Sequence, residues 1–171
     1  GIQFFAYDLK NRKLLYAGPD GPSRAIILAR STGRVYYVPG QGEGSLMRFD
    51  PAKPGPPVKV EGAPALGVRA ATAETADGYV YTVSSGQKAA DANLCAFNTR
   101  TETVEALGLA AVGSQADIST LDADPTGRYL YYIPGAHGSA DRDGTAIVQF
   151  DVKTRQKKVL AFLHPYYQEK Y

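Results

Sequence analysis

One short segment decides the fold, because it occurs three times in the chain. It reads GRVYYVPG at residues 33–40, GYVYTVSS at residues 78–85 and GRYLYYIPG at residues 127–135. The three copies start 45 and 49 residues apart. Self-similarity at a spacing of this size predicts structural units that stack on their neighbours, because one such unit cannot bury its hydrophobic faces alone.

A second repeated segment follows the first and ends in an aromatic residue, an Asp or Asn, and a polar turn. It occurs four times, as FAYDLKNR at residues 5–12, MRFDP at 47–51, CAFNTR at 95–100 and VQFDVKTR at 148–155. The Asp or Asn side chain can accept hydrogen bonds from backbone amides a few residues further on, so each copy predicts a tight hairpin. The segment DPTG at 124–127 predicts another turn, with Pro at its first central position and Gly at a positive φ.

The turns divide each repeat into four short strands, which we call a, b, c and d in chain order. Strands are expected at residues 25–29, 35–38, 46–50 and 58–61 in the first repeat, at 69–74, 79–83, 94–98 and 103–107 in the second, and at 118–123, 128–133, 146–152 and 157–163 in the third. Residues 4–8 and 13–17 are expected to be strands c and d of a unit at the start of the chain.

Four-stranded antiparallel units that repeat every 40 to 50 residues are typical of β-propeller blades. A β-sandwich is the alternative, but a sandwich would not repeat its turn residues in the same phase. We therefore predict an all-β chain, a β-propeller segment with three complete four-stranded blades plus an N-terminal half-blade. The expected bounds are 1–19 for the half-blade, 20–62, 63–109 and 110–163 for the blades, and 164–171 for the start of a further blade or a tail.

Ring closure adds one expectation about the length of the protein. Propellers usually have about 4–8 blades, so this chain is expected to be a fragment of a longer one, with the remaining blades of the parent chain as its partners. Two copies would supply the strands of seven blades. However, the half-blade needs strands a and b, whereas the chain ends after a strand d.

The units DPTGRYLY at 124–131 and FDVKT at 150–154 resemble the repeats of bacterial propellers of the YVTN, streptogramin-lyase and SMP-30 type. The resemblance implies the propeller fold and a bacterial protein of the periplasm or the extracellular space. Its motifs are strand and turn residues, which specify a fold and leave the activity open. The chain has no Trp and no Gly-Gly pair, so it departs from the WD and kelch patterns.

Composition argues against two kinds of partner. The net charge is +2, and no basic block is long enough to follow a nucleic-acid backbone. No apolar stretch approaches the roughly 18 residues that a membrane span needs. Cys95 has no second cysteine to pair with and lies in an apolar run, so we expect a buried thiol. The tyrosine pairs at 36–37, 131–132 and 166–167 could form a stacking platform, but alternation along a strand favours one ring on each face of the sheet.

The candidate site residues lie in the polar loops between strands b and c, with one addition after the last strand d. Binding candidates are Gln41, Glu43, Gln87 and Asp91. The metal candidates are His137, Asp141 and Asp143, which place one imidazole and two carboxylates within seven residues and could hold a divalent cation such as Ca²⁺. The loop lacks the full pattern of a calcium loop, and a solvated turn is the alternative.

Two functions are open at this point, and the sequence does not establish whether the chain is an enzyme. In the first, the chain is a binding or scaffold propeller that contacts a protein or small-molecule ligand at the rim of the b–c and d–a loops. In the second, it is a metal-dependent hydrolase or lyase of the lactonase or lyase kind, and the resemblance to streptogramin lyases implies His137 or His164 as its general base. The acidic residues Glu43, Asp91 and Asp117 do not share one position in the repeat, which counts against the second function.

Overall fold

The computed structural model describes residues 3–22, 24–40, 44–83, 92–113, 118–134 and 145–163. Throughout these residues the secondary structure is strand and turn. The strands are β1 (Phe4–Asp8), β2 (Lys13–Gly18), β3 (Ile27–Ala29), β4 (Arg34–Tyr37), β5 (Met47–Phe49), β6 (Val58–Lys59), β7 (Ala70–Ala71), β8 (Tyr79–Val83), β9 (Asn93–Asn98), β10 (Thr103–Leu109), β11 (Ile118–Ala123), β12 (Tyr129–Pro134), β13 (Ala146–Asp151) and β14 (Gln156–Phe162).

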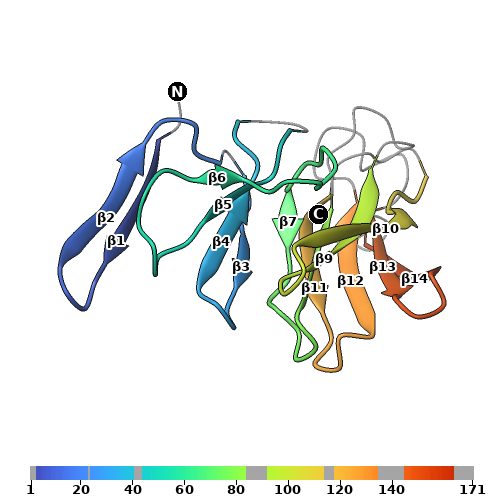
Figure 1. Ribbon diagram of the computed structural model, residues 1–171. Helices are drawn as coiled ribbons and strands as arrows, with labels where there is room; N and C mark the ends of the chain where they lie inside the picture. Colours follow the sequence, from blue (N-terminus) through green and yellow to red (C-terminus); the bar gives the residue numbers. More distant parts are fainter. Residues whose placement is uncertain are drawn as a thin grey trace.

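The strands form one two-stranded and three four-stranded sheets, all antiparallel. Each four-stranded sheet is a meander in which consecutive strands pair, namely β3–β6, β7–β10 and β11–β14. Figure 1 shows the four sheets following one another in chain order, from the β1–β2 pair to the β11–β14 sheet. The prediction of three complete four-stranded blades preceded by a half-blade is confirmed.

Several strands are shorter than expected, and β7 is the clearest case. Strand a of the second blade was expected over residues 69–74, but only Ala70 and Ala71 pair regularly with β8. The Thr72 hydroxyl accepts a hydrogen bond from the Tyr81 amide at 3.0 Å, while the Thr72 amide donates to the Tyr81 carbonyl at 2.9 Å. A side-chain oxygen thus replaces a backbone acceptor there, and this interrupts the regular ladder without leaving the chain unbonded.

The hairpins between strands c and d use the predicted side-chain acceptors. The Asp151 carboxylate accepts from the Lys153 and Thr154 amides at 2.9 and 3.1 Å, and the Asn98 side chain accepts from the amides of residues 100 and 101 at 2.9 and 3.1 Å. These two hairpins and the one after Asp8 each have one non-glycine residue at positive φ. These residues are Arg12 at 52°, Glu102 at 58° and Arg155 at 58°.

The core lies between the blades. One cluster of buried apolar side chains joins the β3–β6 and β7–β10 sheets, and a second joins the β7–β10 and β11–β14 sheets. The tyrosine pair of β4 is divided between two layers, as alternation predicted. The Tyr36 ring lies 4.7 Å from the Phe97 ring in the following blade, and the Tyr37 ring lies 5.0 Å from the Phe4 ring in the half-blade. Cys95 is buried, as expected.

Candidate functional site

The predicted site residues fall on segments that the structure leaves undescribed. They are Gln41, Glu43, Gln87, Asp91, His137, Asp141, Asp143 and His164, and Asp117 belongs with them. These binding, metal and catalytic assignments therefore stay predictions. Within the described ranges, no group of three or more His, Cys, Asp or Glu residues could hold a metal ion, and no helix is long and apolar enough to cross a membrane.

The rim that these loops form can nevertheless be located from their ends. Gly44, at the end of the first b–c loop, exchanges two backbone hydrogen bonds of 3.1 Å with Leu66 in the following d–a connection. Ala110, just after β10, donates to the carbonyl of Ala92, just before β9, at 2.7 Å. The b–c and d–a loops therefore meet at the same end of the blades.

A groove with a volume of about 570 Å³ opens near this rim along β7 and β11, the first strands of the last two blades, which we call the inner strands. Its lining residues come from the start of the first blade, from β7, and from three strands of the last blade. They are Ala25, Arg69, Ala70, Ala71, Thr120, Leu121, Asp122, Tyr131, Tyr132, Ile133 and Ile147. Ile133 and Ile147 lie next to the ends of the third b–c loop, so the groove adjoins the rim that the sequence predicted as the binding region.

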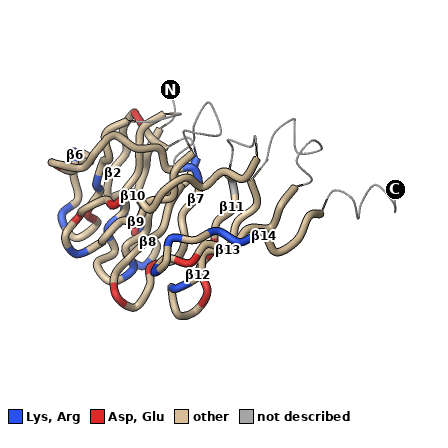
Figure 2. The backbone as a smooth tube through the Cα atoms, turned by 90° about the vertical axis from the view of Figure 1, so that its right-hand side faces the viewer, with Lys and Arg blue, Asp and Glu red and all other residues tan. Residues whose placement is uncertain are grey.

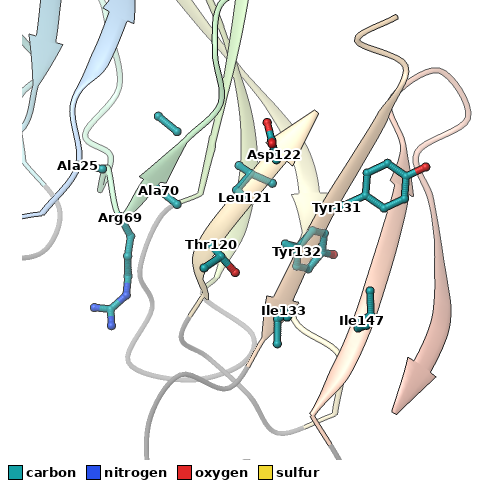
Figure 3. Close-up of a pocket in the computed structure, with 11 residues that line it drawn as sticks. Ala25, Arg69, Ala70, Thr120, Leu121, Asp122, Tyr131, Tyr132, Ile133 and Ile147 are labelled. Atoms are coloured by element: carbon teal, nitrogen blue, oxygen red, sulfur yellow. The ribbon is translucent and has the colours of Figure 1, made fainter. Parts of the chain in front are cut away.

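The groove combines apolar walls with charged groups at two places. Figure 3 shows Arg69 and Asp122 on neighbouring inner segments, with their charged ends pointing in opposite directions along the groove. Thr120 and Asp122 are exposed, whereas Leu121 between them is 9% exposed and packs into the core. The alternation of exposed and buried residues in β11 can be seen in the sequence. The contribution of Arg69 to the groove cannot, because Arg69 lies about fifty residues before Thr120 in the chain.

The tyrosines of the groove have different surroundings. The Tyr132 hydroxyl is buried and donates to the Ala110 carbonyl at 2.7 Å, and burial raises the pKa of Tyr132. Tyr132 is thus a structural donor. Tyr131 faces the other side of the sheet, where its hydroxyl accepts a hydrogen bond of 2.9 Å from the Gln149 amide. The polar groups in position to contact a ligand are therefore those of Arg69, Thr120 and Asp122.

A polar cluster at the interface between the first two complete blades holds these two blades together. Glu102 accepts hydrogen bonds from the Tyr36 hydroxyl at 2.7 Å and from the Arg48 guanidinium at 2.7 and 2.8 Å. Desolvation raises the pKa of Glu102, but the hydrogen bonds from Arg48 and Tyr36 outweigh it and hold the pKa below its ordinary value. Burial, together with the bond to Glu102, raises the pKa of Tyr36 to about 12.

A second carboxylate ties the same two blades together. Glu74 accepts from the amide and hydroxyl of Ser31, both at 2.7 Å, and from the Thr99 hydroxyl at 2.6 Å. Partial burial raises the pKa of Glu74, while the bonds from Thr99 and Ser31 lower it by more. Because Ser31 belongs to the preceding blade, Glu74 and Glu102 both join blades.

The similarity to known proteins is confined to structure. No protein-family model and no curated protein matches this chain. A chain in the crystal structure of a nidogen/laminin complex aligns with a TM-score of 0.54 and 15% identity, over 94% of this chain and 61% of that one. The crystal structure of TolB from Acinetobacter baumannii aligns with a TM-score of 0.55 and 12% identity, over 92% of this chain and 37% of that one.

Both similar structures are β-propeller proteins, and this chain spans less than two thirds of the length of either. At such low identity the similarity concerns the fold. Together with the sheet order, it shows that the chain is a β-propeller segment.

Proposed function

We propose that this protein is a binding or scaffold propeller whose ligand occupies the inner-strand groove and the adjoining rim of b–c and d–a loops. The observation that supports this proposal is the groove itself, which brings Arg69, Thr120 and Asp122 together beside apolar walls. Binding sites are typically concave and largely apolar, with a few polar groups that orient the ligand.

The charges of the groove favour a ligand with a particular arrangement of groups. Arg69 precedes β7 and lies at the rim end, where a guanidinium would attract a carboxylate or another anion. Ile133 and Ile147 supply apolar surface near the same end. A ligand with an anionic group on an apolar body fits this end of the groove, while Asp122 lies toward the other end.

The test uses 4-phenylbutyrate as the probe and follows the methyl NMR signals of Leu121, Ile133 and Ile147. We expect saturable shifts with a dissociation constant on the order of 1 mM, which is typical of a ligand of this size. Arg69→Gln should weaken binding at least about fivefold, because a charge-assisted hydrogen bond is lost.

Two matched variants separate charge recognition from a general effect on the fold. Asp122→Asn removes a carboxylate from the groove and should leave the affinity unchanged or increase it. Arg30→Gln removes an exposed arginine from the β3–β4 turn and should have no effect. If the methyl signals do not move, or if all three variants weaken binding equally, the groove is not an anion-binding site.

The same proposal includes the kind of ligand, the type of propeller and its location. One similar structure is a complex between nidogen and laminin, which supports a protein ligand as the alternative to a small molecule. The repeats DPTGRYLY and FDVKT support membership of the YVTN, streptogramin-lyase and SMP-30 type and a bacterial, periplasmic or extracellular protein. The segment bounds 1–19, 20–62, 63–109, 110–163 and 164–171 are part of this proposal too.

A further inference from the structure

The two interfaces between complete blades share a tyrosine on the second strand and a charged residue further out on the same face, on the third strand in one blade and on the fourth in the other. We call the side of each blade that is turned toward the next blade in the chain its forward face. On the β3–β6 sheet the forward face carries Tyr36 and Arg48, and on the β7–β10 sheet it carries Tyr81 and Glu105. Tyr36 is fully buried and Tyr81 is 5% exposed, because the next blade covers both.

Strand register identifies the same face on the last blade. The pairs Val35↔Phe49, Val80↔Phe97 and Leu130↔Phe150 are equivalent. The residue after the first member of each pair is a tyrosine, so Tyr131 occupies the position of Tyr36 and Tyr81. Tyr131 pairs with Gln149, and Gln149 pairs with Lys158. Asp122 of β11 pairs with Tyr131 and shares its face. The forward face of the β11–β14 sheet therefore carries Asp122, Tyr131, Gln149 and Lys158, in strand order, with Lys158 on the outer strand next to the hairpin.

The contact that covers such a face comes from the third strand and the following hairpin of the next blade. Phe97 of β9 lies against Tyr36, and Glu102 of the β9–β10 hairpin binds Arg48. At the next interface, Arg155 of the β13–β14 hairpin binds Glu105 of β10. Glu102 and Arg155 occupy the same hairpin position, with φ of 58° in both.

The charges at these contacts follow a simple rule. Where the forward face carries the cation Arg48, the hairpin of the next blade carries the anion Glu102. Where the forward face carries the anion Glu105, the hairpin carries the cation Arg155. The residue at positive φ in the hairpin is thus opposite in charge to the forward face that it meets. Opposite charges at such a contact favour the correct partner and disfavour others.

We infer that the forward face of Tyr131, Gln149 and Lys158 docks a further β-blade with a defined chemistry. That blade carries an aromatic residue on its third strand, against Tyr131. It carries a carboxylate at the positive-φ position of the following hairpin, opposite Lys158. The basic residues of β14 are marked in blue in Figure 2. The inference extends the two observed interfaces by one step and goes beyond the proposed ligand groove.

A second copy of this chain meets only half of these requirements. Tyr7 of β1 lies one residue before Asp8, in the position of Phe97 before Asn98, and Tyr7 is 47% exposed. However, the hairpin residue at positive φ is Arg12, where the second blade has Glu102. Arg12 would face Lys158, and like charges at an interface oppose association. The aromatic requirement is met, and the charge requirement is not.

This mismatch supplies the test, because one substitution converts the half-blade into the expected partner. One variant, the acceptor chain, offers only the forward face of its last blade. It carries Tyr7→Asp, which prevents its own half-blade from docking on another chain. The other variant, the donor chain, offers only its half-blade. Arg12→Glu gives it the acidic hairpin, and Tyr131→Asp prevents its own forward face from binding a half-blade. We expect an equimolar mixture, studied by sedimentation velocity, to form a 1:1 complex with twice the mass of either chain.

Three controls define the result. A donor without Arg12→Glu should bind the acceptor at least about fivefold more weakly, because like charges then meet. Adding Lys158→Glu to the acceptor should weaken binding of the acidic donor and restore binding of the donor that keeps Arg12. Circular dichroism melting curves should show that every chain remains folded. No ligand is present, so failure here leaves the groove proposal untouched.

Three results of these binding experiments would overturn the inference. If the donors with Arg12 and with Arg12→Glu bind the acceptor equally, Lys158 does not select the charge of its partner. If the unmodified chain forms head-to-tail complexes as readily as the designed pair, a second copy is the occupant. If no mixture associates although all chains are folded, the face does not dock a blade through these residues.

Discussion

The Glu102 carboxylate accepts the hydrogen bond of the Tyr36 hydroxyl at 2.7 Å across the boundary between two blades. The same carboxylate binds Arg48 at 2.7 Å, and these three side chains come from positions up to 66 residues apart in the chain. The pair explains why a half-buried acid is tolerated at a blade interface, since donors from the preceding blade compensate its loss of water.

Glu102→Gln should destabilise the protein. The substitution leaves Arg48 with a neutral acceptor in place of a carboxylate, and it weakens the bond to Tyr36. We expect the free energy of unfolding to fall by about 1–3 kcal/mol, the range for a hydrogen-bonded group of this kind. Urea denaturation followed by circular dichroism measures this, with the exposed Glu61→Gln as control. An equal effect of the two variants would contradict the structural role of Glu102.

The stability should also depend on pH on the acidic side. The pKa values of Glu74 and Glu102 are lowered from 4.5 in the folded chain, so their contribution is present above that value. It is lost as the pH falls below about 4.5 and through the lower pKa of the folded state. Urea midpoints at pH 7, 5, 4 and 3 should therefore decrease less steeply below pH 5 in Glu102→Gln than in the unmodified chain. Identical slopes would argue against the lowered pKa of Glu102.

Phe97→Ala should have a larger effect than the loss of any single polar tie. The Phe97 ring is fully buried and packs against Tyr36, so truncation leaves a cavity between two blades. A loss of about 3–5 kcal/mol is expected for a phenylalanine in such a place. Thermal and urea unfolding measure it, with Leu9→Ala as the control, since Leu9 is 84% exposed. A loss below that of Glu102→Gln would contradict the packing described above.

The metal prediction can be tested by removing divalent cations. If His137, Asp141 and Asp143 hold a cation, EDTA should lower the melting temperature, because a ligand that binds only the folded state stabilises it. His137→Ala should reduce the metal content of the purified chain, while His164→Ala should leave it unchanged. A melting temperature that does not respond to EDTA, with metal content equal in all three chains, would mean that this loop does not bind a cation.

Particular residues show which structural features could be predicted from the sequence and which could not. Asp151 and Asn98 act as predicted, because an Asx turn depends on atoms only two or three residues apart. The expected length of strand β7 was wrong, because the Thr72 hydroxyl competes with the backbone for the Tyr81 amide. The groove was not predicted at all. Arg69 and Asp122 come from different blades, and their proximity depends on how those blades stack.

The amino-acid sequence was enough to predict the repeat, the number and order of the strands, the hairpin turns and the division of the tyrosine pair between two faces. These features follow from alternation and from turn residues, which act over a few positions in the chain. Which charges meet depends on the stacking of the blades, as Glu102 contacts Arg48 and Arg155 contacts Glu105. The physical reason is that blade stacking brings together side chains that are about fifty residues apart, and no local pattern records that pairing.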